Sequence, residues 1–173
     1  MKATITLNSK ILTPDELTIL LEVAANRSRN DEICARLQAQ AGLQGYQIEQ
    51  LKLARYDSRK VALYLPTKGD PYAVIRSIQT RGQLITLSGI QGRALPDLPF
   101  FEGKSWRSTL AEITRDSGVS ATEMDLRRSY VAYLLARKGN TVRAGHEVDP
   151  INIDDREAYP LVSADEAAQW FAA

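Results

Sequence analysis

The sequence contains a single cysteine, a single histidine and no long apolar run. Because Cys34 is the only cysteine, the chain forms no internal disulfide, and its helical-looking surroundings favour a small packed side chain over a nucleophile. One histidine and one distant cysteine do not supply the ligands of a usual zinc site. Nowhere do about eighteen apolar residues run together, which excludes a membrane-spanning helix. Residues 1–8 are too polar for a signal peptide, so we expect a soluble cytoplasmic protein without a metal or other cofactor.

Net charge is also nearly absent, because 22 basic side chains balance 21 acidic ones and leave +1. A chain this close to neutral has no overall field that draws it to nucleic acid or to a membrane. Locally the balance differs: residues 52–110 carry ten basic and four acidic side chains, whereas residues 147–173 carry seven acidic and one basic. The basic middle and the acidic tail either face partners or neutralise each other in the fold.

The remaining composition is that of an ordinary globular domain, with 44% hydrophobic and 25% charged residues. A chain of this length buries about 70% of its unfolded surface on folding, so its core needs no disulfide or metal. We therefore predict one globular domain over residues 1–173.

Capping boxes mark the starts of three helices. A serine or threonine lies three residues before a glutamate in 13–16, 120–123 and 163–166, so each pair satisfies the other's backbone N–H. Apolar spacing and terminal glycines add three further helices, expected over 29–41, 70–81 and 105–117.

Apolar alternation and short apolar runs predict strands over 2–7, 61–65 and 84–87, and we assign 46–55 to a strand rather than a helix. Residues 56–59 then form a hairpin turn into the strand at 61–65. The helix expected between the strands at 61–65 and 84–87 predicts a right-handed crossover with parallel strands. Together these elements predict an α+β fold, a small mixed sheet of about four or five strands covered by five or six helices.

The segment 105–138 resembles the helix-turn-helix of DNA-binding regulators over about twenty residues, because a helix, Gly-Val-Ser at 118–120 and a second helix follow one another. The resemblance implies that the second helix enters the major groove. Its first turn, however, carries the acids Glu123 and Asp125, which would meet phosphates. Its apolar residues fall on two sides of the helix, Met124, Val131 and Leu135 on one and Leu126, Tyr130 and Tyr133 on the other. We therefore favour a central packing helix with Met124, Val131 and Leu135 in the core.

The only histidine, His146, lies beside Glu147 and Asp149, where it would serve as a general base or a metal ligand. We favour a surface histidine, because no second nitrogen or sulfur ligand is near it in the sequence. The carboxylates within 147–157 offer oxygen ligands for magnesium, but an acidic solvated connection fits them better. No catalytic residue and no metal ligand is predicted.

These observations favour a non-enzymatic, regulatory binding protein whose partner is a macromolecule, a protein rather than nucleic acid. Arginine outnumbers lysine fifteen to seven, which suits bidentate contacts with carboxylate or phosphate. We expect the partner to contact arginines of the basic middle segment, namely Arg55, Arg59, Arg76, Arg81 and Arg93. Two alternatives stay open: a nucleic-acid-binding protein that uses this arginine surface and the helix-turn-helix-like segment at 105–138, and a small enzyme that uses His146 with nearby carboxylates.

Overall fold

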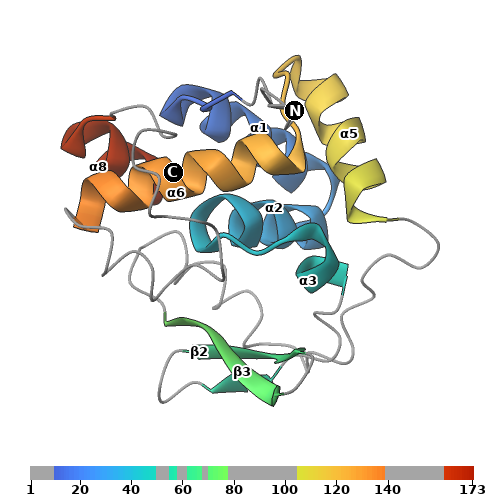
Figure 1. Ribbon diagram of the computed structural model, residues 1–173. Helices are drawn as coiled ribbons and strands as arrows, with labels where there is room; N and C mark the ends of the chain where they lie inside the picture. Colours follow the sequence, from blue (N-terminus) through green and yellow to red (C-terminus); the bar gives the residue numbers. More distant parts are fainter. Residues whose placement is uncertain (1–9, 50–54, 58–61, 68–69, 78–104, 139–161) are drawn as a thin grey trace, which may run out of the picture.

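Figure 1 shows the computed structural model, which describes residues 10–49, 55–57, 62–67, 70–77, 105–138 and 162–173. Its helices are α1 (Pro14–Arg27), α2 (Arg29–Ala41), α3 (Gly45–Glu49), α5 (Trp106–Ser117), α6 (Glu123–Lys138) and α8 (Ala164–Ala172). Its strands are β1 (Arg55–Asp57), β2 (Ala62–Thr67) and β3 (Asp70–Ser77).

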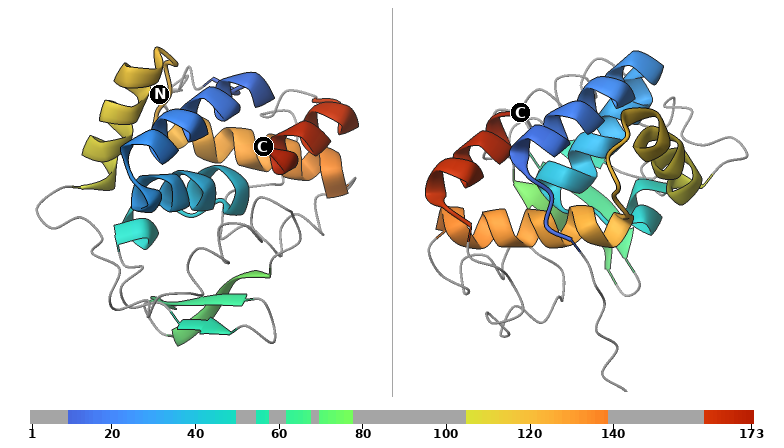
Figure 2. Two further views of the ribbon diagram at one scale, coloured as in Figure 1. Left: turned by 180° about the vertical axis from the view of Figure 1, so that it is seen from behind. Right: turned by 90° about the horizontal axis from the view of Figure 1, so that it is seen from above.

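Helix α6 is the centre of the helical layer. It packs against α2 and α8, while α1 packs against α2, α5 and α8. In Figure 2, α6 crosses the α1–α2 pair, with α5 near its beginning and α8 near its end. The four largest fully buried side chains are aromatic: Trp106 of α5, Tyr130 and Tyr133 of α6, and Trp170 of α8. The core therefore extends along the whole of α6 and joins helices that are far apart in the sequence.

The expected α+β fold is wrong. Where the structure describes side chains, 80% of the residues are helical, and every core residue lies on a helix or in a turn beside one. Strands β1, β2 and β3 form a small antiparallel ladder in that order, drawn apart from the helical layer in Figure 1. The helices bury their apolar faces against one another, so they need no sheet to cover. The part of the molecule with a described core is all-α.

The helix starts expected at Thr13 and Ser163 are confirmed. Each of these residues accepts the backbone N–H of the glutamate three positions on, and that glutamate accepts theirs, which closes a capping box. Helices α2 and α5 match their expected ranges to within one residue. Both end at a glycine in the left-handed conformation, Gly42 with φ 71° and Gly118 with φ 70°. The local signals at these helix ends were sufficient to place them.

The start of α6 differs from the expected one. The helix begins at Glu123 and is capped by Thr122, rather than beginning at Ser120. Thr122 Oγ1 accepts the Asp125 N–H at 3.2 Å, and Asp125 Oδ2 accepts the Thr122 N–H at 2.8 Å. The buried Asp125 also accepts the backbone N–H of Lys10 through its other oxygen at 2.8 Å. This contact with a distant segment favours the box at Thr122 over the box at Ser120.

The three α6 residues expected in the core have three different environments. Val131 is buried, and Leu135 is partly buried against the core. Met124 is 48% exposed, so its assignment to the core is wrong. It lies in the first turn of α6, on the side that lines the groove between α6 and α3.

The strand region and the segment before it contradict three further expectations. Residues 70–77 form β3 rather than the start of a helix, and β3 pairs antiparallel with β2 instead of leading into a parallel crossover. Only two residues separate β2 from β3, the length of a tight hairpin, and the β-branched Val74 and Ile75 suit a strand. The strand expected over 46–55 is wrong at its beginning, because 45–49 is helix α3.

Other strand predictions have a different outcome. The expected hairpin has its antiparallel pairing, because β1 pairs with β2, but Tyr56 and Asp57 lie in β1 rather than in the turn, and residues 58–61 lie outside the described residues. The strands expected over 2–7 and 84–87 lie outside the described residues. In the described ranges, no helix combines the length and the hydropathy that crossing a membrane requires.

Candidate functional site

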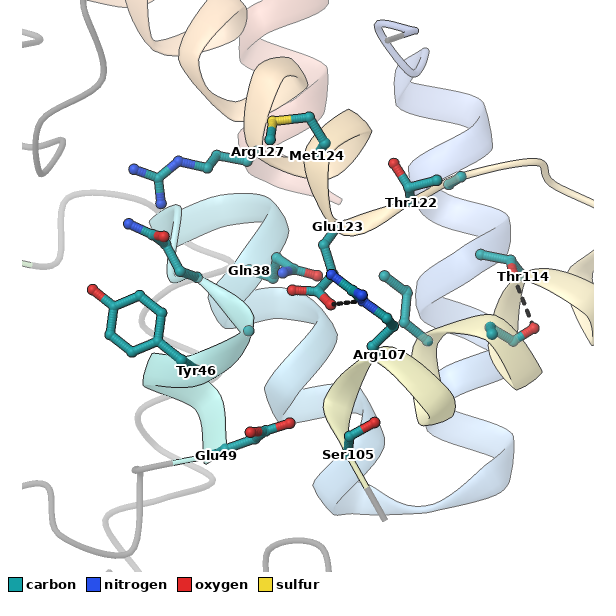
Figure 3. Close-up of a pocket in the computed structure, with 15 residues that line it drawn as sticks. Gln38, Tyr46, Glu49, Ser105, Arg107, Thr114, Thr122, Glu123, Met124 and Arg127 are labelled. Atoms are coloured by element: carbon teal, nitrogen blue, oxygen red, sulfur yellow. Dashed lines mark hydrogen bonds and ion pairs between the residues drawn. The ribbon is translucent and has the colours of Figure 1, made fainter. Parts of the chain in front are cut away.

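A groove of about 760 Å3 lies between α3, α5 and the first turn of α6 (Figure 3). Gln38 of α2 lies at its base, Tyr46 and Glu49 come from α3, and Arg107 comes from α5. A cleft of this volume lies within the range of pockets that bind ligands. We take this groove as the candidate site.

Two exposed apolar side chains line the groove. Among the described residues, the large apolar side chains that are exposed are Tyr46 at 50%, Met124 at 48% and Ile19 at 43%. Tyr46 and Met124 belong to the groove, whereas Ile19 lies on α1 outside it. Exposed apolar side chains that gather at a hollow mark a binding site more often than scattered ones do.

The base of the groove is held by hydrogen bonds around Trp106. The buried indole Nε1 of Trp106 donates to Gln38 Oε1 at 2.8 Å, and its backbone N–H donates to Glu49 Oε1 at 2.8 Å. Ser105 Oγ accepts the Ser108 N–H and so caps α5. These polar groups join α2, α3 and α5, so the base of the groove is formed before any ligand arrives.

Arg107 and Glu123 face each other in the middle of the groove (Figure 3). Arg107 Nε donates to Glu123 Oε1 at 3.3 Å, and the two side chains are 88% and 25% exposed. Glu123 lies directly against Gly45, because a Cβ built on Gly45 would overlap Glu123 Oε2. The missing side chain at position 45 thus makes room for the carboxylate that orients Arg107.

Arg127 completes one rim of the groove. With its amide oxygen turned toward Arg127, Gln44 accepts both terminal guanidinium N–H groups at 2.9 and 3.2 Å. In Figure 3 the side chains of Arg127 and Tyr46 point to the same outer side of the groove. The rim therefore combines a cationic fork with an aromatic ring.

The arginines predicted to contact a partner are only partly described. Arg55 lies on β1 opposite Tyr64, and Arg76 lies on β3 opposite Leu63, so β2 separates their backbones. The remaining predicted residues lie outside the described residues: Arg59, Arg81, Arg93, His146 and the carboxylates within 147–157.

Sequence reasoning missed the residues of the groove. The sequence predicts a strand at Tyr46 and a core position for Met124, so it indicates neither as a binding residue. Arg107 does belong to the basic segment 52–110, and this charge excess was the only signal that pointed to it. The groove forms from elements far apart in the chain, and no local pattern marks such an assembly.

Cys34 packs as a small apolar side chain, as expected. It is fully buried in α2, and burial raises the pKa of its thiol well above its usual value, with the nearby charge of Asp31 adding to the shift. A thiol kept protonated is a poor nucleophile. Within the described ranges, no group of three or more His, Cys, Asp and Glu side chains is arranged to hold a metal ion.

The burial of α6 supports a packing helix rather than a DNA-recognition helix. Residues on both predicted sides are buried, with Val131 on one side and Leu126, Tyr130 and Tyr133 on the other. Five residues, 118–122, separate α5 from α6, so the second helix does not follow directly on Gly-Val-Ser. A helix covered in this way has no long face to place in a major groove.

No protein-family model, no curated protein and no solved structure matches this chain.

Proposed function

We propose that this chain is a non-enzymatic, regulatory binding protein that acts through a protein–protein surface centred on the groove between α3, α5 and α6. The observation that carries the proposal is that two exposed apolar side chains, Tyr46 and Met124, line the same groove. Tyrosine, methionine and arginine are enriched at protein interfaces, and all three residue types line this groove. Anchors that fill such pockets supply most of the energy of binding.

The polar groups of the groove support binding rather than catalysis. Gln38 and Glu49 accept hydrogen bonds from Trp106, and Glu123 accepts one from Arg107. These contacts join the helices to one another, and Ser105 is occupied as the cap of α5. A nucleophile would need a base within hydrogen-bond reach. The groove-lining hydroxyl of Thr122 donates to Asp125 Oδ2 at 2.7 Å, but this pair is the cap of α6 and Asp125 is buried.

The arginines of the middle segment remain a second part of the proposal. Arg107 lies both in the basic segment and in the groove. A nucleic-acid partner for this segment is the alternative. Binding to a nucleic acid and binding to a protein differ in how strongly the affinity depends on salt concentration. Binding to nucleic acid weakens steeply with salt because phosphate counterions are released. A protein partner held by Tyr46 and Met124 would show a shallow dependence.

The test is site-specific photo-crosslinking in cell extract. A photoreactive phenylalanine analogue replaces Tyr46 or Met124 in two variants, and Ile19 in a third. Ile19 is exposed to a similar degree but lies outside the groove, so it is the matched control. We expect one discrete protein adduct from positions 46 and 124 and none from position 19. Equal adducts from all three positions, or none from the groove, would contradict the proposal.

A further inference from the structure

We propose that the groove binds an acidic segment of the partner protein, which seats an apolar side chain between Tyr46 and Met124 and places a carboxylate on Arg107. This inference rests on the proposed function and names the chemistry of its ligand. It is carried by the geometry of Arg107, by the position of Glu123 and by the distribution of charge along the groove.

Arg107 is oriented and at the same time accessible. Its contact with Glu123 uses Nε, and the side chain is still 88% exposed. A guanidinium presents five N–H donors in a planar fork, and two parallel donors match the two oxygens of a carboxylate. The edge formed by the two terminal nitrogens of Arg107 is therefore available to a carboxylate that approaches from solvent.

Glu123 does not fill the place of that ligand. Its carboxylate lies against Gly45, where any larger residue would overlap it, and its side chain is only 25% exposed. It therefore holds Arg107 from inside the groove and leaves the outer side of the guanidinium to a partner.

Charge is unevenly distributed along the groove. Figure 3 shows Glu49 and Ser105 at one end, Arg127 and Met124 at the other, and Arg107 between them. Glu49 repels the carboxylate of a ligand from its own end of the groove. Arg107 in the middle and Arg127 at the other end attract that carboxylate. An acidic segment is therefore bound in one orientation, with its carboxylate on Arg107 and directed away from Glu49.

A basic ligand fits these observations less well. The carboxylate of Glu49 already accepts the backbone N–H of Trp106, and that of Glu123 is paired with Arg107. A cation would meet the guanidinium groups of Arg107 and Arg127 nearby, which repel it. The guanidinium of Arg107 is 88% exposed and its contact with Glu123 uses only Nε, so the ligand that complements it is acidic.

The test uses the purified protein to select ligands from a random dodecapeptide display library. The binding of a selected peptide is then measured with the wild type and with the variants Arg107→Glu and Arg115→Glu. Arg115 is an exposed arginine further along α5, paired with Asp116 and outside the groove, so its reversal changes charge equally. We expect selected peptides to be enriched in Asp and Glu beside an apolar residue. We also expect Arg107→Glu to weaken a selected peptide at least about tenfold and Arg115→Glu to change its affinity less than about twofold. Circular dichroism establishes that both variants fold.

A double variant, Tyr46→Ala with Met124→Ala, separates this inference from the proposed function. Peptides that lose binding in the double variant but lack acidic enrichment would leave the docking groove in place and overturn its preference for carboxylates. Acidic peptides that bind the Arg107→Glu variant with unchanged affinity would also overturn the preference for carboxylates and leave the docking groove in place. Selected peptides that are indifferent to the double variant, or no enriched peptide at all, would overturn both proposals.

Discussion

The phenol of Tyr133 donates a hydrogen bond of 2.8 Å to the carbonyl oxygen of Leu12, which lies 121 positions earlier in the chain. One turn before, Ser129 Oγ accepts the Leu12 N–H at 2.8 Å, and a turn earlier still Asp125 accepts the N–H of Lys10. Asp125, Ser129 and Tyr133 follow one another at intervals of four, so they form a single stripe on α6. This polar stripe fixes the segment that leads into α1 on the central helix.

Removing the Tyr133 hydroxyl should destabilise the protein. In Tyr133→Phe the buried carbonyl of Leu12 loses this donor while the ring keeps its stacking on Trp170, so we expect a loss of about 1–3 kcal/mol in the free energy of unfolding. Urea denaturation measures this loss. The matched control is Tyr46→Phe, in which an exposed hydroxyl is removed and the change should stay below about 0.5 kcal/mol. Equal stabilities of the two variants would mean that the bond to Leu12 contributes nothing.

The same hydroxyl should make stability depend on alkaline pH. Burial, together with the charges of Glu166 and Glu16, raises the pKa of Tyr133 to about 12 from an ordinary value of 10.0. Because the folded pKa lies above the unfolded one, this contribution is complete below pH 10 and is lost as the pH rises from 10 to about 12. The difference in stability between the wild type and Tyr133→Phe should therefore shrink across that interval. A constant difference would contradict the raised pKa.

Gly42 and Gly118 allow the cost of a close contact to be separated from the cost of backbone strain. Both have φ near 70°, but a Cβ at Gly42 would overlap the Tyr130 ring, whereas a Cβ at Gly118 meets nothing within 4 Å. Gly118→Ala should cost about 1–2 kcal/mol from the left-handed conformation alone. Gly42→Ala should cost more, because the Tyr130 ring must also move, and thermal melting of the two variants checks the order. A Gly42→Ala variant as stable as Gly118→Ala would show that the ring yields freely.

Cys34 should not react while the protein is folded. The thiol is fully buried in α2 and its pKa is raised by that burial, so a thiol reagent finds neither access nor a thiolate. We expect no labelling by a chromogenic disulfide reagent at neutral pH and complete labelling of the one thiol in denaturant. Rapid labelling of the native protein would reveal an opening of the helical layer around α2.

The correct predictions rest on interactions within a few residues. Thr13 with Glu16 and Ser163 with Glu166 are complete capping boxes in the sequence, and Gly42 and Gly118 end helices whatever lies around them. Such contacts are the same in any fold, so the sequence alone predicts them.

The wrong predictions concern residues whose state depends on distant partners. The sequence predicts a helix over 70–81, yet residues 70–77 pair with β2 as a strand, because pairing with a neighbouring strand outweighs a weak local helix signal. Thr122 caps α6 because its partner Asp125 also accepts a hydrogen bond from the backbone N–H of Lys10. No local pattern reveals this contact with a distant segment. The groove could not be foreseen for the same reason, since α3, α5 and α6 meet only in the folded chain.

The dispersal of the core along the sequence has a consequence for protein synthesis. Helices α1 and α2 leave the ribosome before the helices that cover them, α6 and α8, which end at Lys138 and Ala172. At translation rates of about 5–20 residues per second, the uncovered face of this helix pair waits about 5–25 s for its partners. During that interval the apolar face that α6 and α8 later cover is open to other apolar surfaces, so the nascent chain is the form most exposed to chaperones and to aggregation.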